Sequence, residues 1–373
     1  MQKKMFTLLS TMICVSTIGV HATNAYAESN AASSVQSTNN PLFKNQRYLQ
    51  PAPYGIDAEY SWTKPGGDGQ DITFVDMENG WLLDHEDLVD KNIQLVPGSV
   101  NLLHQAGHGT SVLGIVVASD NNIGVVGTSP KANAMVTSTT RSDGSGNMAD
   151  SILQAVKVMK PGDVLLLEMQ VGSKLGLAPI EYDIEKFNAI KYATDKGIIV
   201  IEAGANGSVN LDKLTDANGK YTLNRNSPDF KDSGAIMVGA ASSSLPHKRL
   251  YFSNYGSRID TYAWGENVTT TSLSGYTSYF NGTSSASPII AGAAVNLQGI
   301  SKKVLGRPLT PKEMRDLLTD PVTATLSANP ENDRVGVMPN LKAIINKLEN
   351  ATNNVNTSSN LKNESNDNIV FPE

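Results

Sequence analysis

Short runs of aliphatic and β-branched residues alternate along the chain with stretches in which apolar residues recur at helical spacing. Four of the runs predict strands that are buried on both faces: Ile72–Val75, Asp163–Leu167, Gly197–Ile201 and Ala235–Gly239. Two of these runs are each preceded by a stretch whose apolar residues share one face of a helix. These residues are Ile152, Val156 and Met159 in the first stretch, and Ile184, Phe187, Ile190 and Ala193 in the second. Because strand and helix alternate, the pattern predicts a three-layer α/β fold with a largely parallel central sheet flanked by helices.

Helix signals late in the chain indicate where the folded domain ends. Thr310-Pro311-Lys312-Glu313 has the form of a capping box, and Leu341, Ile344 and Leu348 form a last apolar stripe. Residues 28–49 and 350–373 are rich in small and polar residues without periodicity, so we expect a short N-terminal linker and an Asn/Ser-rich disordered tail. A single domain over residues 50–349 is therefore predicted.

The first 27 residues have the features of a secretory signal peptide. Lys3 and Lys4 precede an apolar run from Met5 to Val20, and Ala25-Tyr26-Ala27 has the small-x-small form of a cleavage site. We expect residues 1–27 to be removed and the protein to be secreted, to the extracellular medium or the periplasm. No later segment has the roughly 18 uninterrupted apolar residues of a membrane span, so no membrane association is expected after signal removal.

Composition narrows the class of protein further. The 373-residue chain is 40% hydrophobic and 18% charged, which is typical of a globular protein and not of a fibrous or wholly disordered one. The formal net charge of −6 becomes more negative when Lys3 and Lys4 leave, which argues against nucleic-acid binding. The single cysteine, Cys14, lies in the signal segment, so the exported protein is expected to lack disulfides.

Two segments place an acid and a base where catalysis would need them. The buried run Ile72–Val75 ends in Asp76, and a carboxylate in that position caps a loop or takes part in a site. His108 opens an apolar segment between two glycines. The positive end of a helix keeps such a histidine neutral, and a general base must be neutral near pH 7.

A third segment, Asn281–Gly292, places serines just ahead of a helix with proline in its expected first turn. A serine there has its hydroxyl and its own N–H at the positive helix end, which suits an activated nucleophile and half of an oxyanion hole. We take Ser284 as the nucleophile. From the residues alone, the hydroxyls of Ser285 and Ser287 compete for that role.

Together these segments resemble the Asp, His and Ser motifs of the subtilisin-like serine peptidases, in that family's chain order. The most specific is Gly-Thr-Ser-x-Ala-x-Pro, which begins at Gly282, followed by His-Gly-Thr, which begins at His108. The resemblance covers roughly residues 50–349. It implies a subtilisin-like fold and a serine endopeptidase in which Asp76 orients the histidine, His108 acts as base and then acid, and Ser284 attacks the peptide carbonyl.

The same resemblance implies further site residues. Asn206 follows the run Gly197–Ile201 at the distance expected of the family's oxyanion-hole asparagine, although Ala205 directly before it departs from the usual Ala-Gly-Asn order. The segments that would clamp an extended peptide contain Gly144, Ser145, Gly146, Gln170 and Gly172. Glu168 and Gln170 are unusual residues for the second of these segments.

The acidic motif is the weakest match. The family commonly has Asp-Ser/Thr-Gly, whereas this chain has Asp76-Met77-Glu78, and a glutamate beside the triad would raise the pKa of the histidine. Downstream, Asp84-His85-Glu86-Asp87-Leu88 resembles the family's His-Pro-Asp-Leu, so His85 is interpreted as non-catalytic.

The resemblance implies no cofactor for catalysis. A bound calcium is therefore expected to have a structural role. The loop Ser119–Val125 resembles a subtilase loop that wraps a stabilising calcium, and Asp87 could add a carboxylate. A polar surface turn explains the same residues equally well.

The sequence thus predicts a monomeric, secreted serine endopeptidase that binds a protein or peptide substrate as an extended strand. Three alternatives stay open. A serine-carboxyl peptidase would use an acidic residue as the base, a subtilase-fold binding protein would have lost catalysis, and an acyl transferase or esterase would use the same triad on another acyl acceptor.

Overall fold

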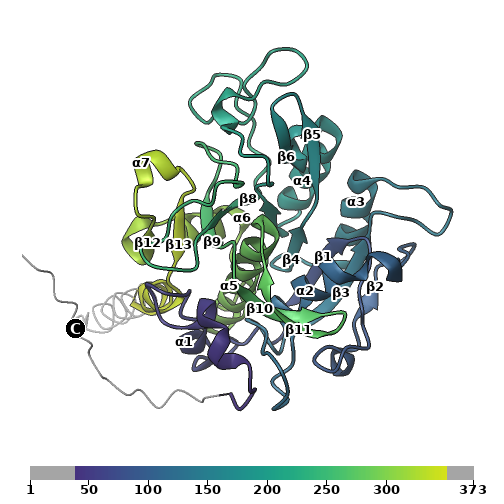
Figure 1. The fold of residues 1–373 in the computed structure, drawn as a ribbon, viewed down its shortest axis with the longest axis vertical. Coiled ribbons are helices and arrows are strands. Elements are labelled where there is room, and N and C mark those ends of the chain that lie inside the picture. Colours follow the sequence, from purple (N-terminus) through teal and green to yellow (C-terminus); the bar gives the residue numbers. More distant parts are fainter. Residues whose placement is uncertain (1–37, 351–373) are drawn as a thin grey trace, which may run out of the picture. The chain divides into compact units, whose positions relative to one another are not determined.

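A nine-stranded sheet forms the centre of the computed structural model, which describes residues 38–350 (Figure 1). Every pairing in it is parallel except that of its last two strands. From one edge the order is β2 (Gln94–Leu95), β3 (Asn133–Ser138), β1 (Thr73–Glu78), β4 (Val164–Leu167), β7 (Ile199–Ala203), β8 (Ile236–Ala241), β9 (Thr261–Trp264), β13 (Val337–Pro339) and β12 (Ala324–Leu326). The predicted largely parallel sheet is confirmed.

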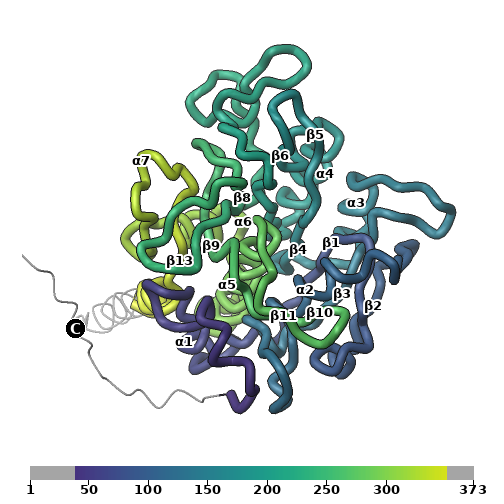
Figure 2. The backbone as a smooth tube through the Cα atoms, viewed as in Figure 1, coloured from purple at the N-terminus to yellow at the C-terminus, as the bar shows by residue number. Residues whose placement is uncertain are grey.

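Helices cover both faces of the sheet, and the alternation of side chains along β1 shows which helix covers which face. Phe74 packs in one apolar cluster with residues of α2 (Ala106–Val117) and α5 (Thr283–Val304). Its neighbours Val75 and Met77 point the other way, into a cluster with residues of α3 (Met148–Val158) and α4 (Ile184–Asp195). The path of the chain through these layers can be followed in Figure 2.

Shorter elements complete the fold. The remaining helices are α1 (Ala58–Trp62), α6 (Pro311–Leu318), α7 (Pro330–Asp333) and helical residues 341–350. Two hairpins stand apart from the main sheet, one formed by β5 (Gln170–Ser173) and β6 (Gly176–Pro179), the other by β10 (Val268–Ser272) and β11 (Gly275–Phe280). Single 3₁₀ turns lie at Phe43–Asn45, Arg47–Leu49, Val89–Lys91, Leu103–Gln105, Ile180–Tyr182, Leu211–Lys213 and Pro321–Thr323. The capping box predicted at Thr310 is present at the start of α6.

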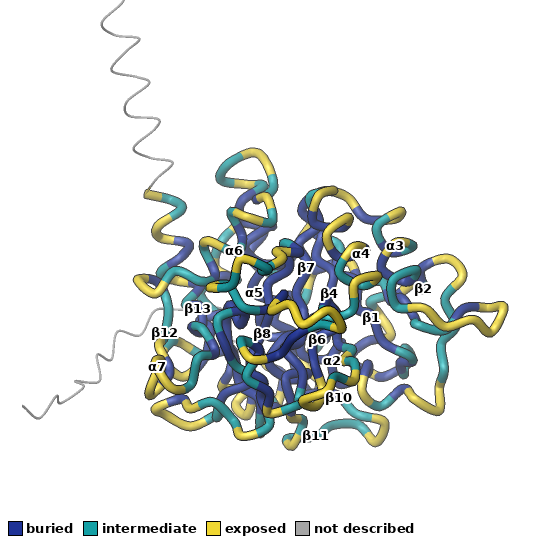
Figure 3. Tube along the Cα trace, turned by 90° about the horizontal axis from the view of Figure 1, so that it is seen from above, coloured by how far each residue is buried: buried dark blue, intermediate teal, exposed yellow. Residues whose placement is uncertain are grey.

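The long helix α5 is the rigid element on which the site is built. Every residue from Thr283 to Ser301 is buried, and the helix lies among the buried segments in Figure 3. A helix that is apolar or small on all sides is normally enclosed by the core, which holds its first turn in place. Within residues 38–350, no helix is long and apolar enough to cross a membrane.

The folded unit extends beyond the predicted N-terminal boundary at residue 50. Tyr48 and Leu49 are fully buried, and the Tyr48 hydroxyl donates to the carbonyl of Thr269 at 3.0 Å. The last part of the expected linker, residues 38–49, therefore belongs to the folded unit, because its few large apolar side chains fill the core. The expected signal peptide, the rest of the linker and the tail from residue 351 lie outside the described residues.

Parallel strands bring distant parts of the sequence to one edge of the sheet. β1, β4 and β7 are neighbours, with Met77 opposite Leu167 and Leu167 opposite Glu202. Their carboxyl ends therefore lie side by side, which places Glu78, Glu168 and the loop that contains Asn206 along a single edge. The first turns of α2 and α5 carry His108 and Ser284.

Candidate active site

The serine motif forms the start of α5. Gly282 is the N-cap, with φ of 98°, a left-handed conformation that favours glycine. The helix begins at Thr283, so Ser284 lies inside its first turn, and Pro288 lies in the second turn and not in the first as expected. The N–H of Ser284 points out of the helix start and donates to no residue of the described chain.

The structure distinguishes the three serines by what their hydroxyls contact. Ser285 donates to the carbonyls of Trp264 and Gly282 at 3.0 and 3.1 Å. Ser287 donates to Glu168 at 2.5 Å and to the carbonyl of Thr283 at 2.7 Å. Both hydroxyls are fully buried and hold the helix start together, whereas Ser284 is 7% exposed. Ser284 is therefore the serine that a substrate could reach.

His108 lies in the first turn of α2. Its Nδ1 donates a short hydrogen bond to Oε1 of Glu78, and its imidazole is 41% exposed. The ring also meets the edge of Phe280 on β11, with 5.4 Å between centroids. Contacts on two sides hold the imidazole in one orientation and leave part of it open to solvent.

Glu78, and not Asp76, is the carboxylate that contacts the histidine. The two residues are two apart on β1, so they share a face of the sheet, but Glu78 is the last residue of the strand and reaches the start of α2. Asp76 lies deeper, fully buried, and its Oδ2 accepts a hydrogen bond from Trp81 Nε1 at 2.7 Å. The expectation that Asp76 orients the histidine therefore does not match this geometry.

A sequence signal for Glu78 exists in hindsight. Glu78-Asn79-Gly80 has the acid-polar-glycine form that Asp76-Met77-Glu78 lacks. The family resemblance favours an aspartate, and the apolar pattern predicts a strand that ends at Val75, so neither points to Glu78 at the end of the longer strand.

Asp76 is a buried acid that is bonded to Trp81 and not to the histidine. Burial, reinforced by the nearby charge of Glu78, raises the pKa of Asp76 well above its usual range, although the bond from Trp81 opposes the shift. Its Oδ1 has no partner among the described residues. Trp81 is itself fully buried and packs where only the absence of a side chain on Gly109 leaves room, since a Cβ there would lie 2.5 Å from its Nε1.

Carboxylates also raise the pKa of the histidine. Burial of the ring lowers the pKa of His108, but the charge and hydrogen bond of Glu78, with smaller contributions from Glu168 and Asp76, outweigh it and raise the pKa to about 9. Solvent screens part of this attraction, because the imidazole is partly exposed. The predicted direction of the shift, from a glutamate beside the triad, is the one found.

Glu168 follows β4 and is enclosed in the same cluster. A carboxylate oxygen of Glu78, a carboxylate oxygen of Glu168 and a ring nitrogen of His108 all lie within 4.8 Å of one another. Such a group could hold a metal ion, but the hydrogen bond between Glu78 and His108 already joins two of its members. Sequence reasoning noted Glu168 only as an unusual residue in the substrate-binding segment.

Asn206 lies beside the nucleophile with its amide oriented by two hydrogen bonds. Its Oδ1 accepts from the N–H of Thr283 at 2.9 Å and from the Thr283 hydroxyl at 3.1 Å. The Nδ2 group consequently faces away from Thr283, and it donates to no described residue. A Cβ built on Gly282 would lie 3.2 Å from Asn206 Nδ2 and 3.5 Å from Ser284 N, so the missing side chain leaves space beside both donors.

The expected substrate-binding residues fall into two groups. Gln170 and Gly172 lie on β5, and Gln170 Oε1 accepts the N–H of Asn206 at 3.0 Å, which links this strand to the site. Gly144, Ser145 and Gly146 form an exposed turn that is closed by hydrogen bonds between Arg141 and the turn itself. The structure thus links Gln170 to Asn206 beside the nucleophile, while within residues 38–350 no hydrogen bond joins the Gly144–Gly146 turn to Ser284.

His85 is committed to the structure through both ring nitrogens. Nδ1 accepts the N–H of Asp87 at 3.1 Å, and Nε2 donates to the carbonyl of Gly275 at 2.7 Å. This buried histidine has both ring nitrogens bonded within the fold, which agrees with its interpretation as non-catalytic.

In the loop expected to bind calcium, three backbone carbonyl oxygens converge on a single side-chain atom. The carbonyls of Ser119, Ile123 and Val125 lie 3.1, 2.6 and 2.5 Å from Nδ2 of Asn40. An amide nitrogen has only two hydrogens for these three acceptors, and two of the distances are shorter than usual for N–H···O. Asp87 and the side chain of Asn121 border the same loop. Carbonyl and carboxylate oxygens of this kind are the ligands that Ca²⁺ prefers.

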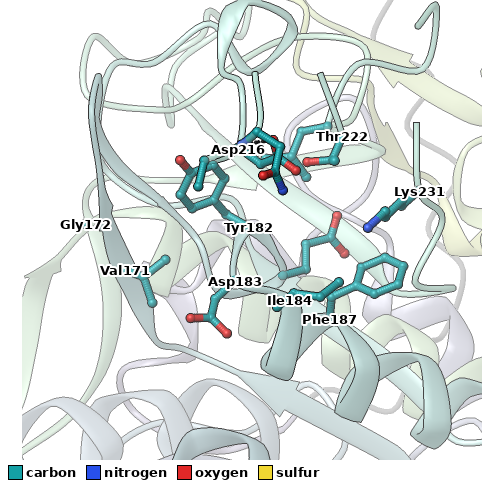
Figure 4. Close-up of a pocket in the computed structure, with 13 residues that line it drawn as sticks. Val171, Gly172, Tyr182, Asp183, Ile184, Phe187, Asp216, Thr222 and Lys231 are labelled. Carbon is teal, nitrogen blue, oxygen red and sulfur yellow. Dashed lines mark hydrogen bonds between the residues drawn. The ribbon is translucent and has the colours of Figure 1, made fainter. Parts of the chain in front are cut away.

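A separate pocket of about 370 Å³ is lined in part by residues of β5 (Figure 4). Val171 and Gly172 form one wall, Ile184 and Phe187 of α4 form the floor, and Lys231 lies at its rim with Nζ 5.9 Å from the Phe187 ring centroid. None of Glu78, His108 and Ser284 lines it. The pocket therefore borders the strand expected to bind substrate but is not where Ser284 would react.

Known proteins match this chain over most of the described region. A family model described as the subtilase family matches residues 84–337. Subtilisin amylosacchariticus from Bacillus subtilis subsp. amylosacchariticus is 30% identical over 252 residues, which cover 66% of this chain and 61% of that protein. Thermitase from Thermoactinomyces vulgaris is 26% identical over 260 residues, covering 69% and 83%. This chain therefore spans less than two thirds of the first of these relatives.

Solved structures show the same fold. A protease from Pseudoalteromonas arctica superposes with a TM-score of 0.60 at 21% identity, covering 84% of this chain and all of that one. A cold-adapted subtilisin-like serine proteinase gives a TM-score of 0.53 at 22% identity over 74% of this chain and 89% of the other. The family match begins at residue 84, after Glu78, so the acidic motif lies outside it.

Proposed function

The chain belongs to the subtilase family, and from that premise we propose that it is a secreted serine endopeptidase whose triad is Glu78, His108 and Ser284. The observation that carries the proposal is the hydrogen bond from His108 Nδ1 to Glu78, made at the same edge of the sheet as the accessible Ser284. The expected signal peptide supports the secreted location, and the negative net charge argues against a nucleic-acid partner.

In the proposed reaction, His108 removes the hydroxyl proton of Ser284 as the serine oxygen attacks the peptide carbonyl. Glu78 stays ionised, accepts the Nδ1 hydrogen, and stabilises the imidazolium that forms. The Ser284 N–H and Asn206 Nδ2 donate to the developing oxyanion. His108 then gives its proton to the departing amine, and the acyl group is left as an ester on Ser284.

The second half of the reaction repeats these roles with water. His108 removes a proton from the attacking water, the oxyanion donors stabilise the second tetrahedral intermediate, and the proton returns to Ser284 as the ester breaks. The products are a peptide with a new carboxylate and the free enzyme. No metal or cofactor takes part in these steps.

Substrate recognition is proposed to use the open edge of β5. This strand pairs only with β6 in the described chain, and Gln170 at its start is bonded to the backbone of Asn206. An extended peptide that added to the free edge would pass in front of the oxyanion donors. The Gly144–Gly146 turn remains a proposed second wall of this cleft, and a single chain suffices for the whole site, in keeping with a monomer.

The proposed chemistry is tested by labelling with a fluorophosphonate, which reacts only with an activated serine. Purified wild-type protein should gain one adduct by intact mass, and the Ser284→Ala and His108→Ala variants should gain none. Ser285→Ala is the matched control, since that hydroxyl is bonded to backbone carbonyls, and it should still be labelled. Folded wild-type protein that takes no label would instead favour the binding-protein alternative.

We also propose that the Ser119–Val125 loop holds a structural calcium. Asp87, Asn121 and the three loop carbonyls would hold the ion, and the Asn40 amide, which now satisfies those carbonyls, would have to turn aside. The ion would neutralise the crowded oxygens and stabilise the folded loop, with no part in the chemistry.

Chelation should therefore lower the thermal midpoint of the protein. A ligand present at about a hundred times its dissociation constant stabilises the fold by roughly 2.7 kcal/mol, so thorough calcium removal should lower the midpoint by about 5 °C. Asp87→Asn should abolish this response, and Asp84→Asn, an exposed neighbour with the same charge change, should keep it. A midpoint that does not respond to chelation in wild-type protein would mean that the Asn40 amide alone completes the loop.

A further inference from the structure

Glu168 is a buried acid in the site for which the proposed mechanism has no use. It directly follows β4, between the strand ends of β1 and β7, and is 6% exposed. Its Oε1 accepts the Ser287 hydroxyl at 2.5 Å, while its Oε2 is buried and has no partner among the described residues. The Ser284 hydroxyl interacts with this carboxyl group closely enough to lower the pKa of Glu168. An unpaired acid oxygen therefore lies beside the nucleophile.

The charges around Glu168 come from two elements. Glu78 and Asp76 on β1 are acids, and His108 on α2 is the cation that lowers the pKa of Glu168, while α5 contributes the hydroxyls of Ser284 and Ser287. Burial raises the pKa of Glu168, the cationic form of His108 opposes the shift, and the charge of Glu78 adds to it, so that the pKa is about 8. Near neutral pH the group is therefore a carboxylic acid that can donate as well as accept.

We propose that Glu168 is a positioning residue for the nucleophile, and that in its neutral form it donates a hydrogen bond to the oxygen of Ser284. This inference rests on the proposed peptidase function. With the neutral acid as donor, the Ser284 oxygen is held in place and its own hydrogen stays available to His108. The Ser287 hydroxyl, bonded to the other oxygen of Glu168, fixes the plane of the carboxyl group.

Ionisation of Glu168 reverses this bond. A carboxylate can only accept, so it takes the hydrogen of Ser284 and competes with His108 for the proton that must be removed. The productive form therefore has a proton on Glu168 and none on Nε2 of His108. Because the two groups interact, they titrate as a coupled pair in the range where both pKa values lie, about 8 to about 9, and the pH–rate profile is a narrow bell.

Glu168→Gln tests the inference, because glutamine copies the neutral acid. Its carbonyl can accept from Ser287 and its amide can donate to Ser284, but it cannot ionise. The rate of fluorophosphonate labelling should be measured from about pH 6 to about pH 11 in wild type and variant. The maximum labelling rate of the variant should stay within about tenfold of the wild-type maximum. The fall in labelling rate at alkaline pH should disappear, because glutamine cannot ionise. The rise in labelling rate should begin at a lower pH, because the charge of Glu168 that raises the pKa of His108 is gone.

Glu202→Gln is the matched control. Glu202 lies on the next strand, and it too is fully buried, has a raised pKa due mainly to burial, and has an unpaired Oε2, but its neighbours are Glu181 and Arg258. Substitution of Glu202 should leave the bell-shaped pH–rate profile unchanged. Glu168→Ala, which removes the donor, should lower the maximum rate by about 10- to 100-fold relative to Glu168→Gln if it folds, which a thermal melt verifies.

Two results would overturn the inference. A profile for folded Glu168→Gln that retains the alkaline descent would mean that Glu168 does not control it. A loss of labelling in Glu168→Gln as complete as in His108→Ala would mean that the carboxylate is itself the base, as in the serine-carboxyl alternative. Both results are distinct from failure of the peptidase proposal, in which wild-type protein is not labelled at any pH.

Discussion

Glu78→Gln should lower kcat by about 10⁴-fold while the protein stays folded. The carboxylate accepts the Nδ1 hydrogen of His108, which leaves Nε2 as the base, and it stabilises the imidazolium in the transition state. A glutamine amide can donate to Nδ1 and so select the opposite tautomer, in which Nε2 carries the hydrogen and cannot accept the proton of Ser284. Hydrolysis of a peptide substrate at saturating concentration measures the effect, and a thermal melt verifies the fold.

Asp76→Asn is the matched control for this substitution. Asp76 lies on the same face of the same strand, but burial raises its pKa well above the usual range, and it bonds to Trp81 and not to His108. An asparagine carbonyl can accept the same hydrogen bond from Trp81, so kcat should change only slightly. Loss of activity in Asp76→Asn with normal activity in Glu78→Gln would restore Asp76 as the orienting acid and contradict the triad proposed above.

Asn206→Ala should lower kcat by about 10²- to 10³-fold, with little change in KM. The Oδ1 of Asn206 is held by two bonds from Thr283, so its Nδ2 is aimed before substrate arrives and no reorganisation is needed as charge develops on the carbonyl oxygen. A donor that acts mainly on the oxyanion contributes about 2.7–4 kcal/mol to the transition state and little to the bound substrate.

Asn206→Asp separates the donor from the acceptor. Aspartate keeps an oxygen for Thr283 but replaces the donating amide with an oxygen, so the loss in kcat should be at least as large as for alanine. Asn281→Ala, an exposed neighbour of the same motif, should have near wild-type activity. An Asn206→Asp variant with wild-type kcat would exclude the amide as an oxyanion donor and leave Ser284 N–H as the remaining one.

Much of the fold could be predicted from local pattern. The runs at Ile72–Val75, Asp163–Leu167, Gly197–Ile201 and Ala235–Gly239 all correspond to strands of the central sheet, because strands buried on both faces are continuously apolar. The N-terminal boundary was less predictable. Residues 38–49 are polar on average, and only the burial of Tyr48 and Leu49 against distant parts of the chain makes them part of the folded unit.

The residues of the candidate site were likewise predictable only in part. His108 and Ser284 could be named from sequence because glycines and small residues surround them in a specific order, and the structure places both at helix starts. The acid could not be chosen by that route. Asp76 and Glu78 lie on one face of the strand, and only the position of α2 decides which of them reaches the histidine.

The amino-acid sequence alone is enough to predict which local structure each segment prefers, since buried strands, helix caps and glycine-rich turns follow from short-range sterics and hydrophobic periodicity. The tertiary structure decided which acid meets His108, which serine hydroxyl remains accessible, and that Glu168 lies unpaired beside the nucleophile. These choices depend on the ends of three neighbouring strands and two helices that are far apart in sequence. Hydrogen bonding and burial act over a few ångströms in space, so local patterns could name candidate residues but could not decide between them.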